Sequence, residues 1–298
     1  MLLFPACSCF AATDEPQAED DIGDKVLFGA PASRIISLYP GHTENLMAIG
    51  AGSLLVGTGQ GDDETGRGSM PNLGARPGVE QIIALKPDLV LSRPMYVRGQ
   101  PALYGRLRSL GVKVLALDPP AWDEFPAYVD ILARVTGMAP ESGAAAAAEL
   151  RALEGDGLSG DVGRGVLLIT VGRTMSTCTP DSWAAHILRS AGLRNAAADA
   201  EPVSEGSVIA PFGAERLLAS DGEVDVILLQ QGAMNATRAA EFMRDSRFSG
   251  LRAVRAGMVF DVAEADISRP SLLRLRRGIV EALRELVEGR EEFNGSDG

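Results

Sequence analysis

The amino-acid sequence predicts an α/β protein with two parallel-sheet lobes joined by a long α-helical connector. Short apolar runs alternate with helical patterns, this rhythm occurs twice, and an alanine-rich helical stretch separates the two occurrences. We expect an N-terminal α/β lobe over residues 31–120, a connector over 121–156, and a C-terminal α/β lobe with a terminal helix over 157–298.

The elements of the first lobe follow from apolar, β-branched runs separated by helical periodicity. Strands are expected at 34–38, 54–57, 88–92 and 113–117, and helices at 43–49 and 103–110. The second lobe repeats the pattern, with strands at 166–171, 224–230 and 258–262 and helices at 182–191 and 214–219. Strands that alternate with helices in this way indicate a parallel sheet.

The two halves also resemble each other in sequence. Residues 80–91 begin with a glutamate, continue as a short helix and end in a buried strand, and residues 215–229 do the same. A duplicated unit is the simplest explanation, although any helix followed by a strand in an α/β fold looks similar. Equivalent positions of Glu80 and Glu215 would favour duplication.

The connector contains the alanine run Ala144 to Ala148, and alanine has the highest helix propensity. We therefore expect a helical spine in place of a flexible linker, bent or interrupted at Gly137 and Pro140.

The first residues suggest export. Residues 1–12 are apolar and end in small residues, as in the last part of a secretory signal that begins upstream of Met1; a buried N-terminal strand is the alternative. Residues 13–30, acidic over 14–24, predict a flexible tether. Lipidation of Cys7 or Cys9 is disfavoured by the residues that precede them, and removal of the leader leaves Cys178 without a disulfide partner. We expect an extracytoplasmic protein, free in the periplasm or tethered to the membrane.

Charge and missing motifs exclude several classes of function. Forty acidic and 28 basic residues give a net charge of -12, which repels nucleic acid. The chain lacks a P-loop and a Gly-x-Ser-x-Gly nucleophile elbow. His42 and Glu44 have the spacing of zinc deaminases, but the Pro-Cys-x-x-Cys of that site is absent.

Three segments carry a family resemblance. Residues 34–50 contain a strand, a proline turn and a helix beginning Thr-Glu; residues 79–91 read Val-Glu-Gln-Ile-Ile-Ala-Leu-Lys-Pro-Asp-Leu-Val-Leu; residues 181–195 end in a small-Gly-x-x-Asn turn. These segments resemble the ABC-importer substrate-binding proteins for vitamin B12, haem and iron siderophores. The resemblance covers roughly residues 34–286.

The resemblance implies two lobes bridged by a helix, with the ligand held in the cleft between them. It further implies a monomeric, non-enzymatic protein without a resident cofactor, which delivers a small metal complex to an ABC permease dimer with its ATPase. A corrinoid is the first choice of ligand, and haem or a ferric siderophore is the alternative. Residues 73–78 lack the large aromatic expected of B12-binding members, which weakens the corrinoid choice.

Ligand contacts are expected in the loops that follow the strands, because open parallel sheets bind ligands beyond the carboxyl ends of their strands. The candidates are Tyr39, His42, Asp62, Asp63, Arg93, Tyr96, Arg173, Met175, Gln230, Gln231 and Arg269. Each is as well explained by packing or solvation, and Trp183 is expected in the core.

Tyr39 and His42 are the preferred pair, because residues three apart at a helix start share one face. Either would serve as an axial ligand of haem iron. Alternatively, His42 caps the helix and Tyr39 packs the turn.

By the same resemblance, Glu80 and Glu215 are expected to dock the permease. The helix dipole offers a purely structural explanation for a glutamate in a first turn. An enzyme related to metal chelatases or nitrogenase-like subunits shares a two-lobed architecture and is the competing class of function; it would need clustered metal ligands.

Overall fold

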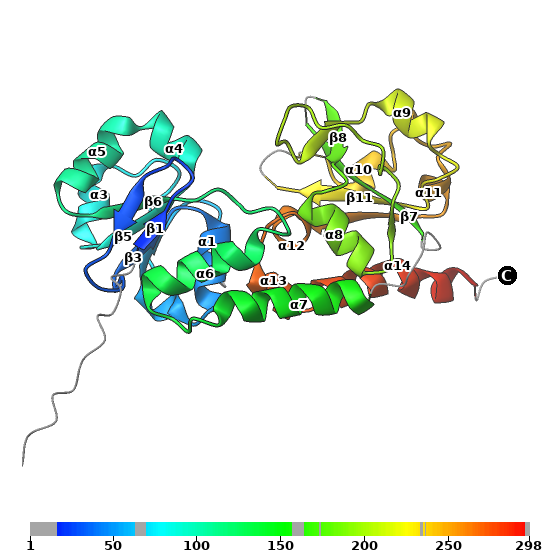
Figure 1. Ribbon diagram of the computed structural model, residues 1–298. Helices are drawn as coiled ribbons and strands as arrows, with labels where there is room; N and C mark the ends of the chain where they lie inside the picture. Colours follow the sequence, from blue (N-terminus) through cyan, green and yellow to red (C-terminus); the bar gives the residue numbers. More distant parts are fainter. Residues whose placement is uncertain are drawn as a thin grey trace, which may run out of the picture. The chain divides into compact units, whose positions relative to one another are not determined.

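The computed structural model describes residues 17–62, 70–156, 164–172, 174–232, 235 and 237–295 (Figure 1). The expected leader, Asp63 and Arg173 lie outside these residues. The chain forms two compact units: an N-terminal unit made of the residues up to Asp118 together with Asp130–Pro140, and a C-terminal unit made of Pro119–Val129 together with the residues from Glu141 onward. Both are α/β units with parallel strands, as the sequence predicts.

The N-terminal unit is built on a parallel sheet. Its described strands follow the order β4-β3-β5-β6. The elements are β3 (Ile35–Ser37), α1 (Pro40–Ala48), η1 (Ala51–Leu54), β4 (Leu55–Thr58), α3 (Val79–Ala84), β5 (Leu89–Ser92), α4 (Pro94–Gly99), α5 (Pro101–Ser109) and β6 (Lys113–Ala116).

Alternation along these strands builds the core. Ile36, Val90 and Val114 are in register on neighbouring strands and share one face of the sheet. They pack with buried residues of α3, α4 and α5, including Ile82 and Leu107. On this face the core therefore forms between the sheet and three short helices.

The segment expected to be a flexible tether is partly folded, and that prediction is wrong from residue 17 onward. Strands β1 (Gln17–Glu19) and β2 (Lys25–Leu27) pair in an antiparallel hairpin. Asp20 is the physical reason. Asp20 is only 4% exposed, and its carboxylate accepts hydrogen bonds from the backbone N–H groups of Ile22, Asp24 and Ala116. Acidic composition suggested disorder, whereas this carboxylate organises a turn.

The connector is helical and interrupted where the sequence predicts. Helix α6 (Phe125–Thr136) is followed by Gly137, whose φ of +67° favours glycine, and α7 (Ser142–Asp156) begins after Pro140. The spine therefore consists of two successive helices. No helix in the described parts is long and apolar enough to cross a membrane.

The C-terminal unit has a mixed sheet around a parallel core. The described strands follow the order β10-β8-β7-β11-β12, and β9 also pairs with β7. Strands β7, β9, β11 and β12 are parallel, and β8 and β10 add an antiparallel edge that the sequence rhythm did not predict.

The elements of this unit after α7 are β7 (Gly165–Val171), β8 (Met175–Cys178), α8 (Trp183–Ser190), β9 (Arg194–Asn195), β10 (Ile209–Pro211), α9 (Ala214–Ala219), β11 (Val226–Gln231), α10 (Ala239–Phe242), α11 (Arg252–Arg255), β12 (Val259–Ala263), α12 (Glu264–Ile267), α13 (Leu272–Arg276) and α14 (Ile279–Gly295). Trp183 is buried, as predicted, with its ring 4.6 Å from that of Trp122.

His42 lies inside the N-terminal unit. Its side chain is fully buried, and Nε2 donates a hydrogen bond of 3.1 Å to the carbonyl oxygen of Leu117. Burial, assisted by the nearby positive charge of Arg93, lowers the pKa of His42 from 6.5 to about 4. The imidazole is therefore neutral in the folded protein at neutral pH.

We predict that Asp20→Asn lowers the free energy of unfolding by about 1–3 kcal/mol, because the amide NH2 would face the N–H of Ala116 and leave that donor unpaired. Urea unfolding at pH 7 measures the change. Asp24→Asn is the matched control, since it removes the same charge from an exposed pair with Arg108. Equal stability of the two variants would contradict the role of Asp20.

We also predict that His42 makes stability fall with acidity. Its contribution is fully present above pH 6.5 and is lost as the pH falls toward 4, because the unfolded state binds the proton first. At pH 4.5 the loss amounts to about 2–3 kcal/mol. Between pH 6.5 and 4.5 the free energy of unfolding should fall more steeply for the wild type than for His42→Gln, which lacks the titrating imidazole, whereas parallel pH profiles would refute the prediction.

Candidate ligand-binding site

The strand order of the N-terminal sheet reverses direction at β3, and two loops follow from this reversal. The chain leaves β3 toward β4 on one side and then crosses to β5 on the other side. At such a reversal the loops at the carboxyl ends diverge, and ligands bind there in open α/β sheets. Tyr39 follows β3 by two residues, and Arg93 follows β5 directly.

Tyr39 and Arg93 meet at this edge. The Arg93 guanidinium lies 5.4 Å from the centre of the Tyr39 ring, and its Nη2 lies 3.6 Å from a carboxylate oxygen of Asp118. The latter distance is too long for a hydrogen bond. The Nε of Arg93 is buried and has no hydrogen-bond acceptor among the described residues. The sequence-predicted residues thus bring together an aromatic phenol and a cation with unused donors.

Of the expected pair, the structure leaves only Tyr39 near a surface. Tyr39 is half-buried at the N-terminal end of α1 and makes no side-chain cap, whereas His42 is fully enclosed. Their rings meet edge to face, with centroids 5.0 Å apart. The two residues are neighbours, as their spacing predicts, but the His42 imidazole is enclosed in the unit and hydrogen-bonded to Leu117, so it does not reach the surface beside Tyr39.

Two further candidates, Asp62 and Tyr96, belong to this unit. Asp62 is half-buried and follows Gly61, whose φ is +90° and where an added Cβ would lie 3.3 Å from Cγ of Pro40. Tyr96 is 38% exposed on α4, one turn from Arg93. The loop of Asp62 therefore approaches the start of α1.

The C-terminal unit repeats the reversal of strand order between β7 and β11. Val171, the last residue of β7, donates its backbone N–H to the side chain of Asn235, in the loop after β11. A pocket of about 810 Å³ lies here. Met175, predicted as a ligand contact, lines it together with Thr237, Phe242, Arg244 and Phe248.

The pocket combines an aromatic wall with a cation. The rings of Phe242 and Phe248 stack at 4.5 Å. Arg247 is committed to Asp245 at 2.6 Å, whereas Arg244 is exposed and forms no ion pair with the described residues. This arrangement suits a large apolar ligand with an anionic group.

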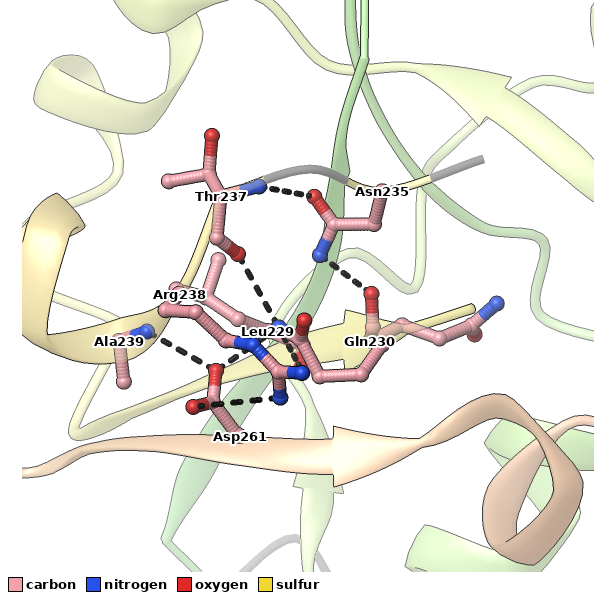
Figure 2. Close-up of polar contacts among 8 residues, drawn as sticks. Leu229, Gln230, Asn235, Thr237, Arg238, Ala239 and Asp261 are labelled. Atoms are coloured by element: carbon pink, nitrogen blue, oxygen red, sulfur yellow. Dashed lines mark hydrogen bonds and ion pairs between the residues drawn. The ribbon is translucent and has the colours of Figure 1, made fainter. Parts of the chain in front are cut away.

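The other candidates of this unit support the loops. Gln231 donates to Asp261 at 2.7 Å and to the backbone oxygen of Thr237 at 3.0 Å. Gln230 accepts from the Ser268 hydroxyl, and Arg269, 9% exposed, pairs with Glu264. Figure 2 shows that Asp261 also receives the backbone N–H of Ala239 and faces Arg238. The side chains of Gln231 and Arg269 therefore hold parts of this unit together through their hydrogen bonds and ion pair.

Sequence reasoning missed Asn235, Asp261 and the pocket-lining Thr237 and Arg244. The side chain of Asn235 also donates to the backbone of Gln230 (Figure 2), so one amide contacts the ends of both β7 and β11. Only Asp261 had a signal, as the lone acid within the apolar strand Val259–Ala263. The other three lie outside the helices and strands, where the sequence has no hydrophobic periodicity that could mark them.

No group of three or more His, Cys, Asp or Glu side chains that could hold a metal ion occurs within the described ranges. The clustered ligands that a chelatase-like or nitrogenase-like enzyme would need are thus not seen in that part of the chain.

The two docking candidates occupy locally equivalent positions. Gly78 precedes α3 with φ -79° and ψ 164°, and Gly213 precedes α9 with φ -69° and ψ 164°. Glu80 and Glu215 are each the second helical residue, and both are exposed. This equivalence supports the predicted duplication.

Comparisons with solved structures match this fold. The apo haem-binding protein RhuT of a Roseiflexus species aligns with a TM-score of 0.66 and 22% identity over 86% of this chain and 100% of that one. Haem-binding HutB of Vibrio cholerae aligns with a TM-score of 0.70 and 17% identity over 86% of this chain and 98% of that one. An Fe3+-hydroxamate transport protein of Saccharomonospora viridis aligns with a TM-score of 0.66 and 20% identity over 93% of this chain and 100% of that one.

No curated protein sequence matches the chain. A family model described as periplasmic binding protein, however, matches residues 35–265, which is most of the chain and includes both sheets. The matched residues include both reversals of strand order and their loops. The family consists of substrate-binding transport proteins and not of enzymes. This chain belongs to the periplasmic binding protein family.

Proposed function

We propose that the chain is the substrate-binding component of an ABC importer and that its ligand is haem. The observation that carries the ligand choice is Arg93, whose buried Nε lacks an acceptor among the described residues while its guanidinium lies over Tyr39. A buried donor without an acceptor costs about 1–3 kcal/mol, so a ligand that brings a carboxylate gains that energy. Haem has two propionates for such a cation, and its iron accepts a phenolate ligand.

The competing ligands fit this pair less well. A corrinoid, the first choice from sequence, carries mainly amide side chains, and a ferric hydroxamate offers no free carboxylate to Arg93. The pocket of the C-terminal unit, with its phenylalanine wall and with Arg244, which forms no ion pair with the described residues, suits the same class of apolar, anionic ligand. Haem-binding proteins and an Fe3+-hydroxamate transport protein are both among the solved neighbours, so the choice of haem rests on Arg93 and Tyr39.

Delivery to a permease rests on Glu80 and Glu215. The two exposed acids stand at equivalent places in the two units, which is what a partner with two equivalent subunits requires. We propose that each glutamate pairs with a cationic group of one permease subunit.

We predict that haemin binds saturably, with a Kd of about 1 μM or tighter. Tyr39→Phe should weaken binding about tenfold and remove phenolate-to-iron absorption, because the ring stays while the oxygen is lost. Tyr104→Phe is the control, since that buried hydroxyl is hydrogen-bonded to Ser92 at 2.8 Å. Haemin dimethyl ester tests Arg93: wild type should bind it less tightly than haemin, and Arg93→Gln should bind both equally.

Absorbance titrations measure these effects, with cobalamin and a ferric hydroxamate as further ligands. Saturable binding of either in place of haemin would overturn the haem assignment and leave the transport assignment standing.

For delivery, we predict that Glu80→Ala with Glu215→Ala leaves folding and haemin affinity nearly unchanged and strongly lowers uptake into vesicles that carry the permease and ATPase, since rim charges act on association. Glu281→Ala, in the first turn of α14, controls for the helix-dipole contribution of about 0.3–1 kcal/mol. Normal uptake by the double variant would refute docking through these residues.

A further inference from the structure

The β1–β2 hairpin is fastened to the edge of the N-terminal sheet. The backbone N–H of Asp21 donates to the carbonyl oxygen of Ala116 at 2.9 Å, and the N–H of Ala116 donates to the Asp20 carboxylate at 3.2 Å. Ala116 is the last residue of β6, an edge strand of this sheet. The hairpin therefore reaches the carboxyl end of the sheet, where the loops of the candidate site begin.

The two residues that follow β6 are held from both sides. Leu117 offers its carbonyl oxygen to the enclosed His42 at 3.1 Å. The backbone N–H of Asp118 donates to the Asp21 carboxylate at 2.6 Å. His42 thus fixes this loop from the interior, and the hairpin fixes it from the outer side.

Asp118 connects this loop to the candidate site. Its carboxylate lies 3.6 Å from Nη2 of Arg93, and the Arg93 guanidinium lies over the ring of Tyr39. A continuous series of contacts therefore runs from Asp21 through Asp118 to Arg93. The Asp118 side chain is 51% exposed, and the backbone from which it projects donates its N–H to the Asp21 carboxylate.

We propose that Asp21 is a positioning residue, which orients Arg93 for an anionic ligand through Asp118; this rests on the proposed function, in which Arg93 receives a carboxylate. The hairpin does not need Asp21 to stay in place. Asp20 is buried, Ala18 and Val26 pack in the core, and Asp24 pairs with Arg108 at 3.0 Å. Loss of the Asp21 carboxylate consequently frees the Asp118 backbone and leaves the unit folded.

The test compares Asp21→Ala with Asp24→Ala on the same hairpin and with Asp21→Asn, which keeps an acceptor oxygen. Hydrogen exchange of the Asp118 amide and of the Arg93 Nε–H, followed by NMR without ligand, should accelerate about tenfold in Asp21→Ala only. Haemin affinity should fall about fivefold to tenfold in Asp21→Ala and recover in Asp21→Asn.

A double-variant cycle separates positioning from a general structural effect. In an Arg93→Gln background, Asp21→Ala should cause no further loss of haemin affinity, because its effect passes through Arg93. Unchanged exchange of Arg93 Nε–H in Asp21→Ala, or equal losses with and without Arg93, would overturn the proposal. Wild-type protein that does not bind haemin would instead refute the proposed ligand, and the exchange result would still decide the role of Asp21.

Discussion

The reversal of strand order in each sheet is the constraint on which the rest of the molecule depends. Parallel strands require crossover connections, so the loops at the carboxyl ends all lie at one edge. Where the next crossover passes to the opposite side of a central strand, two of those loops separate. In the N-terminal unit this separates the loops after β3 and β5, and in the C-terminal unit those after β7 and β11. Tyr39, Arg93 and the pocket near Val171 follow from this one feature.

The buried polar residues near the carboxyl ends of β3 and β5 are hydrogen-bonded within the N-terminal unit. Thr43 donates to the Ser37 hydroxyl at 2.8 Å, and Ser92 is hydrogen-bonded to the Tyr104 hydroxyl. His42 is consumed similarly by Leu117. Because buried polar groups need partners, these contacts leave the loops with a defined shape. The Nε of Arg93 is the contrast, a buried donor with no acceptor among the described residues, and it lies at the edge where the loops diverge.

The sequence predicted what is periodic and missed what is irregular. The parallel strands β3, β4, β5, β6, β7, β11 and β12 lie within one or two residues of their predicted places, because an apolar run reports burial directly, whereas β1, β2, β8, β9 and β10 were not predicted. Tyr39 was found from its place after a strand, whereas the enclosure of His42 depends on Leu117, 75 residues away. Asp20 read as part of an acidic tether for the same reason, since its partner Ala116 is 96 residues distant. Thr237 and Arg244 gave no signal because no local pattern marks their loops.

The internal repeat divides into a part that folding explains and a part that it does not. Asp88 directly precedes β5 and accepts the backbone N–H of Ser33, just before β3. Asp225 directly precedes β11 and accepts the backbone N–H of Gly165, the first residue of β7. Buried Ile82 and Leu217 likewise serve the cores. Exposed Glu80 and Glu215 serve neither purpose, and each is followed three residues later by an exposed apolar side chain, Ile83 at 38% and Leu218 at 46%. A helix dipole favours the acids but not the apolar neighbours, so it accounts for only part of this matching chemistry, and the exposed apolar side chains are the part that the docking role proposed for Glu80 and Glu215 would use.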